Sequence, residues 1–391
     1  MSDPTAFPAG LAASLAARLA TVDAELAPTA APARARQAVH TAYVPADRVS
    51  AGTAQEWGRA ALAALAEHAP DPQTLGVDDD VYRRVVAKLE REPVEDLRVD
   101  FEDGYGVRSD AEEDADAERV GALLRSPSTA GSGARIKSLE APTRARALRT
   151  LETLLGSCGR LPVGFVITLP KVSAPEQVAA MQEICAAADS VVGGGPLRFE
   201  LQIETPRAVA RMAEIVAAAG PRCAGLHYGT YDYSASLGIA AAHQSLDHPA
   251  ADHAKAVMQV AAATVGLPVV DGSSNVLPVG DGQAVRSAWA LHRGLVHRSM
   301  TRGFYQGWDL HPAQLVSRYA AVFTFYREGL DAAAQRVRAY ADRVSGGVLD
   351  EPATARALTG YLLRGLDCAA LDESEVSAAS GLDRAGLLAL S

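Results

Sequence analysis

Cysteine is scarce in this sequence, with only four such residues (Cys158, Cys185, Cys223 and Cys368) among 391. No two of them are spaced as in a zinc or disulfide motif, so we expect small buried residues of a reducing compartment. Long apolar runs are absent too, since no stretch approaches the roughly 18 residues that span a bilayer. The first residues lack the basic flank of a secretory signal. These absences predict a cytoplasmic protein without a membrane partner.

An excess of positive charge is also lacking. The chain has 37 lysines and arginines against 47 acidic residues, a formal net charge of −10. This balance argues against nucleic acid or an anionic membrane as the main partner. An early Gly-x-Gly-x-x-Gly motif of a dinucleotide-binding sheet is missing as well. Hydrophobic residues, by contrast, make up 48% of the chain, which permits a large core and excludes wholesale disorder.

Eight short β-type segments alternate with helical patterns along the chain. The alternation predicts an α/β fold, a (β/α)8 TIM barrel with an N-terminal helical segment and a C-terminal helical extension. The expected strands are residues 38–45, 97–101, 134–137, 163–169, 197–203, 223–228, 267–270 and 301–305. The expected helices are residues 11–26, 54–67, 80–90, 110–125, 143–155, 207–219, 253–265, 280–293, 315–328, 330–344 and 354–366.

The same patterns predict three segments. Residues 1–36 are an N-terminal helix and an Ala/Pro-rich linker, residues 37–320 form the catalytic barrel, and residues 321–391 form the helical extension.

Two carboxylates follow neighbouring expected strands. Glu204 closes the segment 197–203 and Asp232 follows the segment 223–228, 28 residues later, about one strand-helix-strand unit. In a parallel barrel this spacing brings both to the carboxyl edge, where two hard oxygen ligands suit a divalent cation with open positions for substrate. The alternative is that Glu204 caps a helix and Asp232 caps a turn.

Charged residues recur at the other expected strand ends. A barrel interior is expected to be filled by apolar side chains, so charges at the strand ends belong to the catalytic face. Any single one of them could instead form a structural salt bridge. The set comprises Asp100, Glu102, Asp103, Arg135, Lys137, Lys171, Glu204, Asp232 and Asp271.

Several short motifs resemble those of one family. Asp100-Phe101-Glu102-Asp103 resembles the Asp-Leu-Glu-Asp motif of the citrate lyase beta-subunit-like group in the HpcH/HpaI aldolase superfamily. Further similar motifs follow in the family's order: Arg135-Ile136-Lys137, Leu169-Pro170-Lys171-Val172, Ile203-Glu204-Thr205, Gly229-Thr230-Tyr231-Asp232, Gly303-Phe304 and His311-Pro312-Ala313-Gln314. The resemblance covers residues 36 to 320. Lys137 stands where the family has Asn, Phe101 where it has Leu, and Tyr231 where many relatives have an acid. These differences leave open the identity of the substrate and any need for coenzyme A.

The resemblance implies a site that holds Mg2+, or Mn2+, through Glu204 and Asp232. Arg135 would grip a substrate carboxylate or enolate oxygen, with Glu102 and Asp103 orienting it or a metal-bound water. Asp271 would take part in proton transfer or, equally, cap the next helix. The remaining expected substrate contacts are Lys137, Lys171, Gly229 and Thr230.

The predicted function is a Mg2+-dependent carbon–carbon lyase or aldolase. It would act through a metal-stabilised enolate on a small oxo- or hydroxy-carboxylic acid, as the free acid or as its coenzyme A thioester. Malate-synthase-like condensation with glyoxylate, acyl-coenzyme A thioester hydrolysis and phosphoenolpyruvate chemistry stay open on the same site. A ligand-binding regulatory protein is the non-enzymatic alternative. The resemblance also implies a homo-oligomer, a trimer or a multiple of one.

Overall fold

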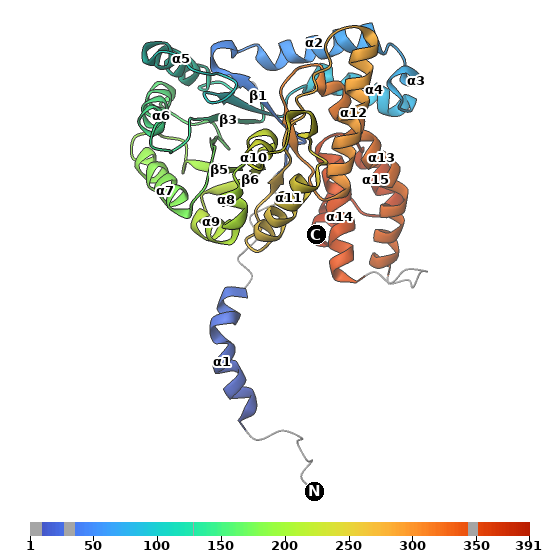
Figure 1. Ribbon diagram of the computed structural model, residues 1–391. Helices are drawn as coiled ribbons and strands as arrows, with labels where there is room; N and C mark the ends of the chain where they lie inside the picture. The colour runs from blue at the N-terminus through green and yellow to red at the C-terminus, as the bar shows by residue number, and fades with distance from the viewer. Residues whose placement is uncertain (1–9, 27–35, 128, 343–350) are drawn as a thin grey trace. The chain divides into compact units, whose positions relative to one another are not determined.

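The computed structural model describes residues 10–26, 36–127, 129–342 and 351–391 (Figure 1). Contacts divide the chain into two units, Met1–Arg36 and Gln37–Ser391. The first unit contains helix α1 (Leu11–Leu26), as predicted from its apolar periodicity. The three-segment division stays a prediction, and its boundary at residue 320 falls inside a continuous helix of the second unit, α13 (Gln314–Ala341).

The second unit is a barrel of eight parallel strands surrounded by helices, which confirms the predicted (β/α)8 fold. The strands pair in the order β7-β6-β5-β4-β3-β2-β1-β8. Two main-chain bonds join the remaining edges, from Asp271 N to Gln306 O (2.8 Å) and from Trp308 N to Gly272 O (3.2 Å). The strands are β1 (His40–Pro45), β2 (Asp96–Asp100), β3 (Gly131–Arg135), β4 (Val166–Leu169), β5 (Arg198–Ile203), β6 (Cys223–Tyr228), β7 (Val269–Val270) and β8 (Gly307–Asp309).

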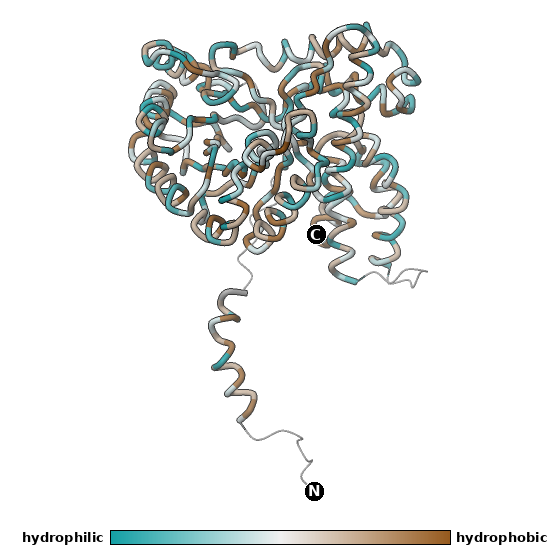
Figure 2. Tube along the Cα trace, in the orientation of Figure 1, coloured by the Kyte–Doolittle hydropathy of each residue, from teal (hydrophilic) through white to brown (hydrophobic). Residues whose placement is uncertain are grey.

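The helices of this unit alternate hydrophobic and hydrophilic residues along their turns, as expected for elements that cover a sheet (Figure 2). Those up to β8 are α2 (Thr53–His68), α3 (Pro72–Leu75), α4 (Asp79–Arg91), α5 (Asp110–Leu123), α6 (Arg144–Cys158), α7 (Pro175–Asp189), α8 (Pro206–Ala210), α9 (Met212–Ala219), α10 (Thr230–Ser236), α11 (Pro249–Ala263) and α12 (Gly282–Thr301). After α13 come α14 (Pro352–Asp367), α15 (Glu373–Ser380) and α16 (Arg384–Ala389). Both α14 and α15 pack on α13, and α16 packs on α14.

Local signals explain why helices begin directly after the strands. Helix α5 starts with a capping box, in which the Ser109 side chain and the Glu112 side chain each accept a main-chain N–H of the other. Helix α8 starts at Thr205, whose hydroxyl accepts the Ala208 N–H at 3.0 Å, with Pro206 in the first turn. These caps fix the loops that carry the strand-end residues.

Several predicted elements differ from the structure, among them the expected helix 207–219, which is two helices, α8 and α9. Residues 301–305 are not the eighth strand, because α12 continues to Thr301 and Gly303 then takes a left-handed turn (φ +87°) before β8. The expected helices 315–328 and 330–344 are one helix, α13, with residues 343 and 344 outside the described range. Gly329 does not interrupt α13, because the Tyr361 ring packs where its side chain would be.

The lumen of the barrel carries charged side chains, so the expectation of an apolar filling was wrong. Asp96 and Arg98 of β2 are buried there, 6% and 4% exposed. Glycines of β3 make room for them: a Cβ on Gly131 would lie 2.6 Å from Asp96 Oδ1, and one on Gly133 would lie 2.9 Å from Arg98 Nε. The Gly-x-Gly pattern of β3 is therefore a packing requirement of this polar interior.

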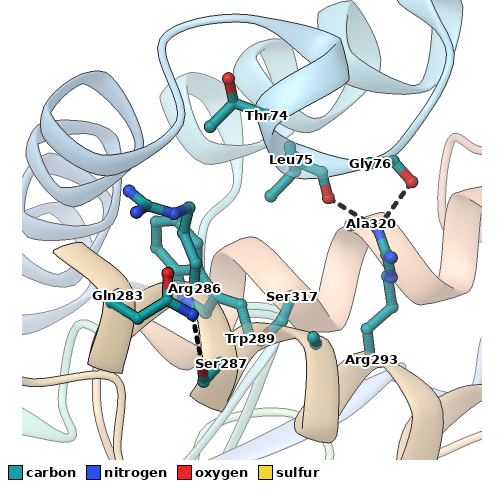
Figure 3. Close-up of a pocket in the computed structure, with 11 residues that line it drawn as sticks. Thr74, Leu75, Gly76, Gln283, Arg286, Ser287, Trp289, Arg293, Ser317 and Ala320 are labelled. Atoms are coloured by element: carbon teal, nitrogen blue, oxygen red, sulfur yellow. Dashed lines mark hydrogen bonds between the residues drawn. The ribbon is translucent and has the colours of Figure 1, made fainter.

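The segment between β1 and β2 forms α2, α3 and α4 and encloses a cavity of about 270 Å3 against α12 and α13 (Figure 3). Arg293 of α12 donates to Leu75 O and Gly76 O, both at 2.7 Å, where α3 ends. Arg286 lines the same cavity and donates to His68 O at 3.4 Å. These bonds tie the inserted helices to the barrel wall. Among the described residues there is no helix with the length and apolar character of a membrane span.

Candidate active site

A fully paired group of side chains, called here the inner cluster (Asp96, Arg98, Thr168, Glu200 and His227), fills the lumen below the strand ends. Arg98 Nε and Nη2 each donate to Glu200 at 2.9 Å, and Arg98 also pairs with Asp96. His227 Nε2 lies 2.9 Å from Glu200. Burial alone would raise the pKa of Glu200, but Arg98 and His227 hold it well below its usual range. Glu200 is therefore a structural anion.

Above this layer, Arg135 is held in one orientation. The register of β2 and β3 places Asp100 beside Arg135, and the guanidinium donates to both Asp100 oxygens at 2.7 Å. The Tyr43 ring lies under the guanidinium, 4.9 Å from Cζ. Only longer contacts remain at Nη1, to Gln202 Oε1 (3.4 Å) and Glu102 Oε2 (3.5 Å). The Nη1 edge is thus the part of Arg135 that can take a substrate oxygen.

Glu204 is a buried carboxylate at the end of β5. Its Oε1 accepts the Lys171 main-chain N–H at 2.7 Å, and its Oε2 accepts the Gln202 amide. Gly229 is required beside it, because a Cβ there would lie 2.4 Å from Glu204 Oε2. Burial, with the charge of Asp232 added to it, raises the pKa of Glu204 to about 8. An added positive charge beside Glu204 would therefore stabilise its ionised form.

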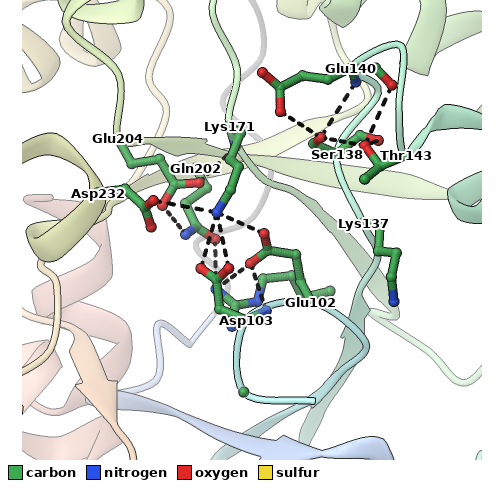
Figure 4. Close-up of polar contacts among 12 residues, drawn as sticks. Glu102, Asp103, Lys137, Ser138, Glu140, Thr143, Lys171, Gln202, Glu204 and Asp232 are labelled. Atoms are coloured by element: carbon green, nitrogen blue, oxygen red, sulfur yellow. Dashed lines mark hydrogen bonds and ion pairs between the residues drawn. The ribbon is translucent and has the colours of Figure 1, made fainter. Parts of the chain in front are cut away.

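Lys171 lies at the centre of the carboxylates (Figure 4). Its Nζ is 2.8 Å from Glu102 Oε1, 3.1 Å from both oxygens of Asp103 and 3.5 Å from Asp232 Oδ1. Its backbone is left-handed (φ +53°), a conformation that lysine rarely adopts and that is frequent at functional sites. We call Glu102, Asp103, Lys171, Glu204 and Asp232 the mouth cluster.

Glu102 and Asp103 behave as a coupled pair. Burial raises the pKa of Glu102 to about 7, with Asp103 adding to the shift and Arg135 opposing it. Burial alone would raise the pKa of Asp103, but the hydrogen bond with Glu102 and the charge of Lys171 lower it. Glu102 can therefore carry a proton near neutral pH while Asp103 stays ionised.

Asp232 is presented by the first turn of α10. Thr230 opens that helix and its hydroxyl donates to Ser273 O at 3.3 Å. Gly272 is needed next to it, because a Cβ there would lie 2.1 Å from Thr230 Oγ1. Burial raises the pKa of Asp232, which Lys171 partly counteracts. Gly229 and Thr230 thus position the two carboxylates.

Sequence similarity assigns the chain to a family. The family described as "Domain of unknown function (DUF6986)" matches residues 19–391. The chain belongs to this family. A curated relative of the DUF6986 chain is an L-malyl-CoA/beta-methylmalyl-CoA lyase of Cereibacter sphaeroides, 28% identical over 225 residues, or 54% of this chain and 65% of the relative. The same enzyme from another strain is 29% identical over 164 residues, 38% and 48% of the two chains. The chain therefore spans less than two thirds of these relatives.

Solved structures share the fold. A citrate lyase from Burkholderia xenovorans superposes with a TM-score of 0.61 at 20% identity, covering 90% of this chain and 98% of that one. The protein CitE from Mycobacterium tuberculosis, solved with magnesium, acetoacetate and coenzyme A, gives 0.51 at 20% identity, covering 83% and 96%. The resemblance of the DUF6986 chain to the citrate lyase beta-subunit-like group is confirmed.

The mouth cluster fits a hydrated divalent cation. Among the described residues, no group of three or more His, Cys, Asp or Glu side chains is arranged to hold a metal by itself. Glu204 and Asp232 instead offer two hard oxygen donors, and burial together with the charge of Asp232 raises the pKa of Glu204. Mg2+ commonly binds proteins through one or two carboxylates and keeps its other positions for water and substrate.

Two predicted site residues, Lys137 and Asp271, pair with groups away from the mouth cluster. Lys137 turns to α5, where its Nζ pairs with Glu113 Oε2 at 2.6 Å and donates to Phe101 O at 2.8 Å. It stands apart from the cluster in Figure 4. Asp271 accepts hydrogen bonds from Lys255 Nζ (3.1 Å) and Ser299, and is 2% exposed. Both have the contacts of structural ion pairs.

Sequence reasoning missed a side chain beneath the site. Gln202, which links Glu204 to Arg135, was not among the predicted residues. Trp308, a pocket or packing residue by its sequence position, donates its Nε1–H to His227 Nδ1 at 3.0 Å. A signal was present in β5, where Glu200, Gln202 and Glu204 alternate with apolar residues at the period of a strand.

Proposed function

We propose that the protein is a Mg2+- or Mn2+-dependent carbon–carbon lyase or aldolase. Its substrate would be a small oxo- or hydroxy-carboxylic acid, free or as its coenzyme A thioester. The observation that carries the proposal is the carboxylate pair at the strand ends, the buried Glu204 and the partly exposed Asp232, both in contact with Lys171, with the pKa of Glu204 raised to about 8. The malyl-CoA lyase relatives support this class of reaction.

Glu204 and Asp232 would hold the cation in this proposal. When bound, it would polarise the substrate carbonyl and stabilise the negative charge of the enolate. Arg135 would bind a substrate oxygen through Nη1, because Asp100 already occupies the opposite edge of its guanidinium. The Tyr43 ring would keep that guanidinium in plane.

Glu102 would move the proton. In the cleavage direction a base takes the hydroxyl proton of the substrate, the carbon–carbon bond breaks, and its electrons form the enolate. Glu102 has the burial, the position beside Arg135 and a pKa of about 7 that suit this task. Lys171 and Asp103 would set its charge state, with Gly229 and Thr230 positioning the carboxylates. Asp271 and Lys137 keep structural roles in this scheme.

The proposed reaction is tested by product analysis. Metal-free protein is supplied with MgCl2 and either pyruvate with aldehydes or acetyl-coenzyme A with glyoxylate. Aldol products from the first set, or a carbon–carbon condensation product that keeps its thioester from the second, support the proposal. Release of free coenzyme A from the second set, without any product that keeps the thioester, would favour malate-synthase-like condensation or thioester hydrolysis, and saturable binding of metal and acid without turnover would indicate a regulator.

We further propose a homo-oligomer located in the cytoplasm. An apolar groove between α9 and α11 supports assembly, since Val260 and Val265 are 71% and 55% exposed there. The four cysteines, all free and buried, suit a reducing compartment. Sedimentation of the full chain tests the first statement, because a fully active monomer would contradict it. Cell fractionation tests the second.

A further inference from the structure

Lys171 differs from an ordinary structural lysine. Lys137 has one carboxylate partner, Glu113. The Lys171 ammonium instead contacts Glu102 and Asp103 of the loop after β2 and Asp232 of α10. It lies where carboxylates from separate strand ends converge.

The backbone of Lys171 reaches the fourth carboxylate. Its N–H donates to Glu204 Oε1 at 2.7 Å, and its φ of +53° directs both the N–H and the side chain to the same cluster. One residue thus contacts both proposed metal ligands, Glu204 by its main chain and Asp232 by its ammonium.

The charge of the cluster depends on this ammonium. Five carboxylates gather at the mouth, Asp100 included, and the two cations that the described contacts place among them are Arg135 and Lys171. Asp100 already occupies the Nε–Nη2 edge of the Arg135 guanidinium. Lys171 is therefore the main counter-charge of the other four carboxylates.

We propose that Lys171 is a built-in counter-ion of the mouth cluster, which a divalent cation must displace from Asp232 before Glu204 and Asp232 can share it. This inference rests on the proposed metal site and adds that Lys171 sets its affinity. An ammonium and a dication repel strongly at about 4 Å in a partly buried site. The lysine side chain is 24% exposed on a flexible stem, so it can swing outward while its main-chain N–H stays on Glu204.

The test is a calorimetric titration of the full-length, metal-free protein with MgCl2. We expect Lys171→Met and Lys171→Gln to bind Mg2+ more tightly than the wild type, roughly tenfold, which lies within the about 5- to 150-fold range typical of coupling between two bound groups. Lys171→Arg should restore the wild-type affinity because it restores the charge. Lys137→Met is the matched control and should leave the affinity unchanged, since its ammonium pairs with Glu113.

The sign of the change separates the possible roles. Weaker or unchanged Mg2+ binding in both charge-removing variants would overturn the counter-ion role and leave the proposed metal site standing. Absence of Mg2+ binding in the wild type and in every variant would overturn both.

A second measurement needs no variant. Acetylation of Lys171 in the wild type, followed by mass spectrometry, should become several-fold faster when MgCl2 is added, because the freed ammonium loses a partner. An unchanged or slower rate would contradict the displacement.

Discussion

Glu200 of β5 and Glu204, the residue that follows this strand, have opposite electrostatic surroundings. Both are buried in the lumen and lie four residues apart. Arg98 and His227 hold the pKa of Glu200 well below its usual range, although burial opposes them. Burial and Asp232 raise the pKa of Glu204 to about 8. The difference is whether the chain supplies the counter-charge.

This contrast divides the lumen into a structural and a functional part. The inner cluster is complete, because Arg98 pairs with both Asp96 and Glu200 and His227 contacts Glu200 within hydrogen-bonding distance. The mouth cluster has more carboxylates than cations, so it is costly in the metal-free protein and gains from an outside cation. An imbalance of this kind, at the carboxyl ends of barrel strands, is typical of a catalytic site.

Replacing Glu204 should have the largest effect. Glu204→Gln removes one proposed metal ligand, and because a bound cation supplies several kcal/mol of charge stabilisation, metal-dependent turnover should fall by at least about 1000-fold. Steady-state rates at saturating MgCl2 measure this. Glu214→Gln, on the exposed surface of α9, should keep full activity. A Glu204→Gln enzyme with normal turnover would make the mouth cluster structural.

Glu200 should matter for stability instead. Glu200→Gln removes one of the two carboxylates that pair with the buried Arg98 and leaves only Asp96, which should lower the free energy of unfolding by about 3–5 kcal/mol. In metal-free protein, Glu204→Gln should cost less than about 1 kcal/mol, because it removes a carboxylate that the fold does not neutralise. Urea unfolding compares the two variants. Equal losses would erase the proposed difference between the clusters.

Acid should weaken the internal ion pairs first. The folded-state pKa values of Glu200 and Asp309 are lowered, against burial, by Arg98 and by Arg318 respectively. Their stabilisation is present above the unfolded pKa of about 4 and is lost as the pH falls toward the folded values, about 1.4 kcal/mol for each pKa unit. Unfolding free energies between pH 6 and 3 should therefore decline, and Glu200→Gln should flatten the curve. Parallel curves would contradict this.

The fold could be predicted because its signal is local. Eight alternating segments give the barrel, and seven of the expected strands overlap the observed ones. The eighth was misplaced because Gly303, Phe304 and Tyr305 have the composition of a strand, whereas the chain turns there.

The inner cluster was missed for a different reason. An apolar barrel interior was expected, although Asp96, Arg98 and Asp100 alternate with apolar residues at the period of a strand. Pairing between Arg98 and Glu200 links residues 102 apart, and the left-handed turn at Lys171 depends on its carboxylate partners. Neither this pairing nor this backbone conformation can be predicted from residues that are neighbours in the sequence. The roles of the predicted site residues stay predictions.

Trp308 lies between the inner cluster and Arg135, and its replacement should have the smallest effect. Its Nε1 donates to His227 of the inner cluster at 3.0 Å, and its ring lies 5.9 Å from the Arg135 guanidinium. Trp308→Phe keeps an aromatic ring beside Arg135 but leaves the His227 acceptor unpaired. The free energy of unfolding should therefore fall by about 1–2 kcal/mol. Mg2+ affinity should stay unchanged, because neither proposed ligand contacts Trp308. Urea unfolding and MgCl2 titration of this one variant measure both quantities. A loss of Mg2+ affinity would mean that the inner cluster also tunes the mouth, and that the two parts of the lumen are a single network.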